Sequence, residues 1–141
     1  MDPQLHRLVW FRGAGVCEYC RMPQPFDPLP LCIDHIVAQK HHGATAEHNL
    51  ALACFNCNSY KGPNIAGIDP ETQQLTRLFD PRQDVWGEHF DWSGARLVGR
   101  TTIARATIDV LNINEPDRVE HRRLLIAEGV FPPKESPGGS T

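Results

Sequence analysis

Apolar residues fall into short runs separated by polar stretches, and these runs predict a series of small elements. A rough apolar stripe at helical spacing lies within residues 2–12. Asp2 can cap a helix there, and Pro3 suits its first position. We therefore expect an N-terminal helix that packs on the part of the chain behind it.

Two strands and a helix are predicted next. Residues 31–37 and 49–53 are apolar runs of strand length, and the polar stretch 38–48 joins them. We expect a β-hairpin with a long connection. A short helix over residues 54–61 should follow, because a Gly-Pro pair comes directly after it and prevents continuation.

The composition changes after residue 63, and acidic residues become more frequent. Four elements are expected in this part: a short helix over 70–79, a hairpin over 90–98 with its turn at Ser93-Gly94, a helix from Thr101 or Thr102 to Asn112, and a helix from Pro116 to Gly129. The arginines of the last helix are expected on a solvated face, since acidic residues alternate with them.

The fold class is therefore α+β, a small core with appendages. Four parts are expected: an N-terminal helix (1–16), a cysteine-containing core (17–63), a C-terminal extension of a β-hairpin and two helices (64–131), and a disordered tail (132–141). A chain of 141 residues is long enough for one domain with a modest core.

Four of the five cysteines form two Cys-x-x-Cys pairs, a pattern typical of a structural zinc site. The pairs are Cys17 with Cys20 and Cys54 with Cys57, and 33 residues separate them. Each pair makes a chelating turn, and four thiolates complete a tetrahedral shell around Zn²⁺. The fifth cysteine, Cys32, lies in a predicted strand and is interpreted as a small core hydrophobe.

The start of the chain lacks the basic and apolar segments of a secretion signal, and eighteen consecutive apolar residues occur nowhere. We expect a cytoplasmic protein without membrane contact, in which thiols stay reduced and bind metal. The net charge of −3 argues against tight electrostatic binding to nucleic acid, although bound divalent ions would add positive charge.

An ionisable pair interrupts the first predicted strand. Asp34 and His35 stand where a core strand should be apolar, and buried ionisable groups are costly unless they are paired or bind metal. A structural hydrogen bond between the two at a strand end would also explain them. Neighbours on a regular strand point to opposite faces, so joint action requires a strand end, a bulge or a twist.

Several motifs agree in order with one known family. Asp34-His35-Ile36, Asn49-Leu50 and the run from Cys57 to Gly62, within the four-cysteine frame, resemble the HNH endonucleases. The resemblance covers residues 17–62. It implies a ββα-metal, treble-clef-like fold in which a hairpin and the following helix hold one catalytic divalent ion beside a structural zinc.

The resemblance also assigns roles by position. Asp34 and Asn58 would be ligands of the catalytic ion, His35 the general base, and Asn49 the asparagine that organises the loop. Asn58 stands where other members have histidine. Lys61 would lie near the phosphate, and His48 is a second candidate for substrate binding.

These residue types suit phosphodiester hydrolysis independently of the resemblance. The reaction needs a water deprotonated near neutral pH, and histidine side chains, with an ordinary pKa of about 6.5, can do this. A hard cation such as Mg²⁺ or Mn²⁺ neutralises charge on the phosphate. The sequence predicts a metal-dependent endonuclease acting on DNA, with a protein partner as a candidate source of specificity. The alternative is a non-catalytic zinc-stapled nucleic-acid-binding module.

Overall fold

The structure, a computed structural model, describes residues 1–134. They form an α+β protein that divides into two compact units. The first unit holds Met1–Ile65 together with Asp80–Asp84, and the second holds Ala66–Phe79 and the chain from Val85 on.

The tail that was expected to be disordered, 132–141, lies mostly outside the described residues. Within residues 1–134, no helix has both the length and the apolar character needed to cross a membrane.

Helix α1 (Pro3–Gly13) begins where the sequence predicted it. The Asp2 carboxylate accepts a hydrogen bond from the Gln4 amide at 3.0 Å and caps the helix. Near the other end, the Arg12 guanidinium donates to the carbonyl oxygen of Leu50 at 2.8 Å. This bond and the buried side chain of Val9 hold α1 against the second strand of the unit.

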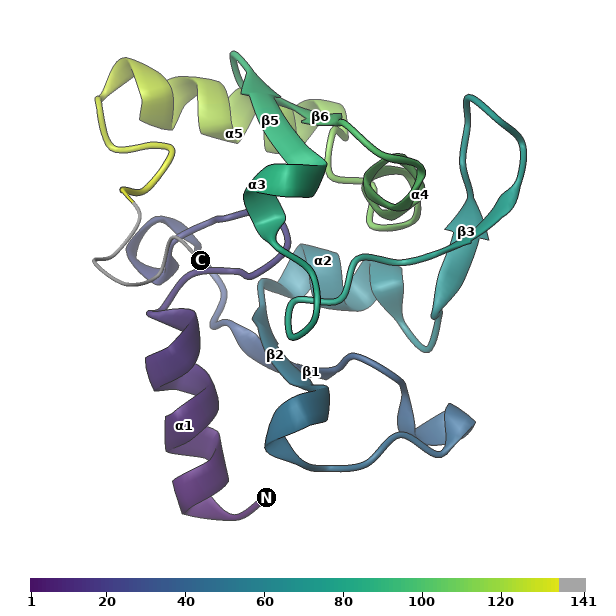
Figure 1. The fold of residues 1–141 in the computed structure, drawn as a ribbon. Coiled ribbons are helices and arrows are strands. Elements are labelled where there is room, and N and C mark those ends of the chain that lie inside the picture. Colours follow the sequence, from purple (N-terminus) through teal and green to yellow (C-terminus); the bar gives the residue numbers. More distant parts are fainter. Residues whose placement is uncertain (135–141) are drawn as a thin grey trace. The chain divides into compact units, whose positions relative to one another are not determined.

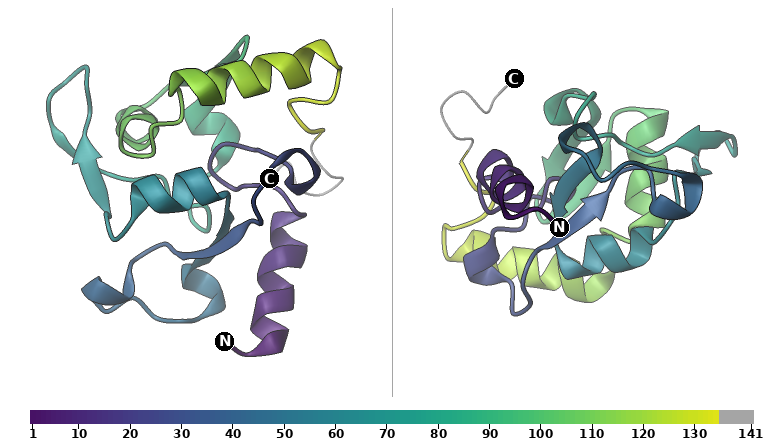
Figure 2. Two further views of the ribbon diagram at one scale, coloured as in Figure 1. Left: turned by 180° about the vertical axis from the view of Figure 1, so that it is seen from behind. Right: turned by 90° about the horizontal axis from the view of Figure 1, so that it is seen from below.

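The expected hairpin is formed by β1 (Cys32–His35) and β2 (Leu50–Ala53), which run antiparallel with Asp34 opposite Ala51. All four residues of β2 are buried. Helix α2 (Phe55–Lys61) follows β2 directly and lies beside the hairpin in every view (Figures 1 and 2). The order β1, β2, α2 confirms the ββα core.

Three short 3-10 turns complete the irregular parts of the first unit: Gln24–Phe26, Gln39–His41 and Glu47–Asn49. The first lies in the proline-rich loop before β1. The other two lie in the long connection between β1 and β2, so this loop is ordered by local hydrogen bonds.

The second unit begins with a hairpin that the sequence did not predict. Strand β3 (Ala66–Ile68) pairs antiparallel with β4 (Leu75–Arg77), so the expected helix over 70–79 is wrong. Gln73 at the tip adopts a left-handed backbone conformation, with φ of 62°, which a helix cannot contain.

Asp69 explains why this segment turns. Its fully buried carboxylate accepts hydrogen bonds from the Glu71 amide at 3.2 Å and the Thr72 hydroxyl at 2.8 Å. The Arg105 guanidinium binds both carboxylate oxygens, at 2.9 and 3.0 Å, and holds the pKa of Asp69 well below its usual range. A long-range ion pair thus fixes a local turn.

The remaining elements are a short helix, a hairpin and two longer helices: α3 (Trp86–His89), β5 (Phe90–Ser93), β6 (Arg96–Gly99), α4 (Thr102–Val110) and α5 (Pro116–Ala127). The hairpin turn is Gly94-Ala95, one residue later than predicted, because Ser93 pairs with Arg96. Gly94 has φ of 58°, which suits glycine at the first turn position. Thr101 caps α4 through the Ala104 amide, as expected.

Two of the three arginines of α5 correct a second expectation, whereas Arg123 is exposed as expected. Arg118 and Arg122 are buried rather than solvated. Arg118 donates to the carbonyl oxygens of Leu111 and Asn112, and Arg122 donates to those of Ala95 and Ile113. The two guanidinium groups donate to backbone carbonyl oxygens of neighbouring segments, and these hydrogen bonds allow the two charged side chains to be buried.

Candidate active site

The four paired cysteines converge in the first unit, and all are buried. Their sulfur atoms lie within 4.8 Å of one another, and those of Cys20 and Cys54 are 3.6 Å apart. With Zn–S bonds of about 2.3 Å, the edge of a tetrahedral site is about 3.8 Å. The four sulfurs are therefore placed to hold a zinc ion.

Each Cys-x-x-Cys pair forms the same chelating turn. The amides of Cys20 and Cys57 donate to the Sγ atoms of Cys17 and Cys54, each at 3.4 Å. Burial raises the pKa of the Cys17 and Cys57 thiols well above its usual value. Without a metal these thiols keep their protons, so binding zinc must release them.

A residue inside the first pair joins the two halves of this site. Glu18 accepts a hydrogen bond from the Leu52 amide at 2.7 Å through one oxygen and pairs with Arg82 through the other. Burial raises the pKa of Glu18 to about 7, against the lowering effect of the Leu52 bond. Arg82 belongs to the segment Asp80–Asp84, which is part of the first unit although it lies after the cysteine core in the sequence. A residue outside the core therefore helps to hold Glu18 in place.

Asp34 in β1 is buried, and each of its carboxylate oxygens accepts one hydrogen bond. One carboxylate oxygen accepts from the Tyr19 hydroxyl at 2.7 Å, and the other accepts from the Lys61 ammonium at 3.2 Å. Burial raises the pKa of Asp34, while the Lys61 charge and both hydrogen bonds oppose that rise. The carboxylate is thus held in place by two side chains far from it in the sequence.

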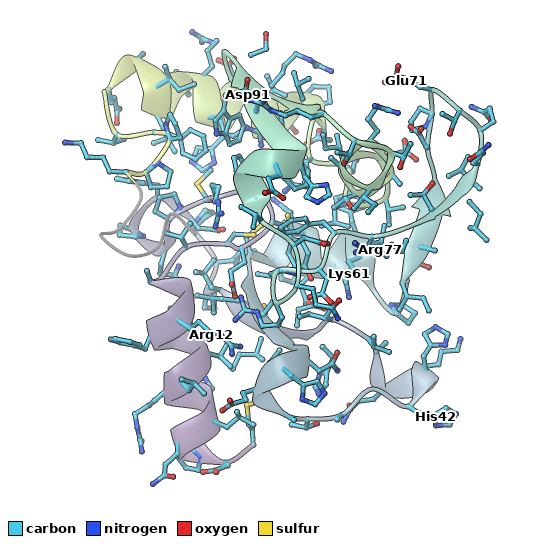
Figure 3. All side chains as sticks on the ribbon, viewed as in Figure 1. Arg12, His42, Lys61, Glu71, Arg77 and Asp91 are labelled. Carbon is cyan, nitrogen blue, oxygen red and sulfur yellow. The ribbon has the colours of Figure 1, made fainter. Side chains whose placement is uncertain are left out.

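Lys61 lies at the end of α2 (Figure 3). Only 1% of its side chain is exposed. Besides Asp34, its ammonium donates to the carbonyl oxygens of His35 at 3.0 Å and Ile36 at 3.1 Å. An ammonium has three protons, and three acceptors surround this one. The arrangement does not favour the phosphate contact that the resemblance implied.

His35 ends β1, and its side chain is partly exposed. Its Nε2 lies 2.9 Å from the Thr45 hydroxyl oxygen, in the loop between β1 and β2. Successive side chains of a strand point to opposite faces, so the side chain of Asp34 lies on the other face of β1, where it is buried. Among the described residues no hydrogen bond joins the two side chains, so a structural Asp34–His35 bond does not explain the pair.

Asn49 organises the loop between β1 and β2. Its side-chain oxygen accepts from the Val37 amide at 2.8 Å, and its amide nitrogen donates to the carbonyl oxygens of Val37 and Ala44, both at 2.9 Å. Gly43 lies so close that an added Cβ would fall 1.7 Å from the Val37 oxygen. The loop carrying Thr45 is therefore pinned at both ends.

Replacing Asn49 with alanine should destabilise the protein by about 2–3 kcal/mol, because three partly buried hydrogen bonds to the backbone of Val37 and Ala44 are lost. Urea unfolding of both proteins measures the difference. Asn56→Ala, at an exposed position on α2, is the control and should change little. Equal stability of the Asn49 variant and the wild type would show that water replaces all three bonds at no cost.

The two remaining candidates are less engaged. Asn58 is partly exposed on α2 beside Cys57, and among residues 1–134 its amide side chain forms no hydrogen bond with Asp34 or His35. His48 is exposed in the turn Glu47–Asn49, and His42 lies at the outer end of the same loop (Figure 3). The expected roles of Asn58 and His48 stay predictions.

The sequence profile of the HNH endonuclease family matches residues 17–64, the stretch that holds the four cysteines, the hairpin and α2. Residues 17–64 form an HNH endonuclease domain. The match covers the ββα core and leaves α1 and the whole of the second unit outside it.

A longer relative extends the similarity beyond the HNH domain. The chain is 24% identical over 112 residues to the Septu protein PtuB of Bacillus thuringiensis, a match that covers 78% of this chain and 41% of that protein. The chain thus spans about two fifths of the length of this relative. No solved structure matches the chain.

Three residues that support the HNH domain escaped the sequence analysis: Tyr19, Thr45 and Arg82. In the sequence, Tyr19 is an aromatic residue between two cysteines and Thr45 is one of many polar residues in a loop, so neither indicates a specific contact. A buried carboxylate in β1 demands donors, and that demand could have suggested a search for partners of Asp34. The pattern alone does not say which donors the fold brings there.

Proposed function

We propose that the HNH domain hydrolyses phosphodiester bonds in DNA with His35 as the general base. The placement of His35 is the observation that supports this most. Its imidazole is partly exposed at the end of β1, and a loop pinned by Asn49 brings Thr45 within hydrogen-bond distance of it. A general base must be reachable and held in one orientation, and this side chain meets both requirements.

The Thr45 contact favours one tautomer for catalysis. If Nε2–H donates to the Thr45 oxygen, the lone pair of Nδ1 is free to accept a proton from water. In the opposite tautomer, Nε2 accepts from the hydroxyl and Nδ1 carries the hydrogen, so neither nitrogen can act as a base. The threonine oxygen also stabilises the imidazolium formed when the water is deprotonated.

Asp34 and Asn58 are the proposed ligands of a catalytic divalent ion. Carboxylate and amide oxygens are the donors that Mg²⁺ and Mn²⁺ prefer, and each Asp34 oxygen keeps a second lone pair beside its hydrogen bond. The donor set fits such an ion, which would share the Asp34 carboxylate with the Lys61 ammonium. When bound, it would supply stabilisation of the negative charge that develops on the phosphate.

The activity is tested with purified, zinc-loaded protein and supercoiled plasmid. Cleavage should appear with added Mg²⁺ or Mn²⁺ and be absent when these ions are omitted. Binding of the plasmid without cleavage under any ion would instead favour a non-catalytic nucleic-acid-binding module. Identical cleavage with and without added divalent ions would contradict the proposed ion.

A protein partner is the proposed source of target specificity. The net charge of −3 gives no overall electrostatic attraction to DNA, and the attraction of local basic groups weakens with salt. Efficient plasmid cleavage by the isolated protein at physiological salt would contradict this part of the proposal, while slow cleavage confined to low salt would support it.

A further inference from the structure

Among residues 1–134, Lys61 is the one buried lysine, while Lys40 and Lys134 are exposed. We propose that Lys61 is a positioning residue that fixes the end of β1, and with it His35, rather than a residue that contacts the substrate. Tyr19 assists by holding the other side of Asp34. The inference rests on the proposed role of His35.

The contacts of the ammonium carry the argument. It lies 3.2 Å from Asp34 Oδ1, 3.0 Å from the His35 oxygen and 3.1 Å from the Ile36 oxygen. Three successive residues of one strand end are thus bound by a single group on α2. Hydrogen bonds from an ionised donor are stronger than neutral ones, so these three restrict the backbone that carries the imidazole.

Burial explains why the ammonium stays there. Lys61 is 1% exposed and Asp34 is 4% exposed, and each charge compensates the other in a place that water does not reach. Turning the ammonium toward a phosphate would leave Asp34 without its cation and two carbonyl oxygens without a donor. Uncompensated buried charge is strongly unfavourable, so this movement is opposed.

Tyr19 makes the clamp two-sided. It is fully buried in the first zinc-binding turn, and its hydroxyl donates to Asp34 Oδ2 at 2.7 Å. The carboxylate is therefore held between the zinc-binding turn and the end of α2. Since His35 follows Asp34 directly, both anchors act on the geometry of the base without touching the substrate.

The test separates substrate binding from turnover. Lys61→Met should lower kcat for plasmid cleavage roughly tenfold to a hundredfold, the size expected from a misplaced base, and leave KM within about twofold of the wild type. Lys40→Met, in the exposed loop, is the matched control and should retain kcat. A raised KM with kcat unchanged in Lys61→Met would overturn the inference and assign Lys61 to substrate contact.

A second variant guards against misfolding of the first, because Lys61→Met leaves Asp34 without its cation. Tyr19→Phe removes one hydrogen bond and keeps the ring. It should lower kcat about threefold to tenfold with KM unchanged. If Lys61→Met does not fold, Tyr19→Phe decides: wild-type kcat in this folded variant overturns the inference.

Amide hydrogen exchange tests the same clamp without any cleavage assay. Exchange at Ile36 and Val37 should be roughly tenfold faster in Tyr19→Phe or Lys61→Met than in the wild type, while exchange in α4 stays unchanged. Unchanged exchange at Ile36 and Val37 in a folded variant contradicts the clamp. A wild-type protein that cleaves nothing would contradict the proposed function alone, since this measurement does not depend on it.

Discussion

Serine in place of Cys57 is expected to unfold the HNH domain. Cys57 is fully buried, and its sulfur is one of four placed to bind zinc. Structural zinc contributes about 10–16 kcal/mol to small zinc domains at neutral pH. The free energy of unfolding of a whole domain is only about 5–15 kcal/mol. The free energy lost with the zinc should therefore be larger than the stability that the packing of the hairpin and α2 provides.

The cysteines provide a matched control for this prediction. Cys32→Ser alters the fifth cysteine, whose side chain is partly exposed in β1 and does not belong to the zinc-binding group. That variant should keep one zinc per chain and melt close to the wild type. Metal content and thermal melting followed by circular dichroism measure both. A Cys57→Ser protein with the melting temperature of the wild type would contradict a structural zinc site.

Removal of the His35 imidazole is expected to lower cleavage by about 10²–10⁴-fold, the usual contribution of a general base. The fold should survive, because the side chain is partly exposed and its described hydrogen bond is the one to Thr45. His35→Ala should therefore keep its zinc and its melting temperature. Cleavage rates measured over a range of divalent-ion concentrations separate the loss of the base from a change in ion binding.

His41→Ala is the control for the His35 variant, since His41 is an exposed histidine in the same loop. It should cleave within about twofold of the wild type. If His35→Ala cleaved as fast as the wild type at every ion concentration, the general base would have to be another group. Partial recovery of the His35→Ala activity by added imidazole would support the assignment directly.

The sequence was sufficient where local patterns decide the structure. Cap and breaker residues predicted α1, α2 and α4 nearly to their ends, and strand-length apolar runs predicted β1 and β2. The spacing of the cysteines predicted a shared site, because each Cys-x-x-Cys pair closes a local turn. The motifs of residues 17–62 also indicated the family, which the profile match over residues 17–64 confirms.

Only the tertiary structure decided what depends on contacts distant in the sequence. A helix was predicted for residues 70–79, but they hold the turn and the second strand of a hairpin, and the Arg105 ion pair with Asp69 holds that turn. Lys61 has the spacing of an active-site residue on α2, yet its ammonium is buried against β1. Sequence spacing places a residue on a helix face; the elements packed against that face determine whether its charge meets solvent or a buried carboxylate.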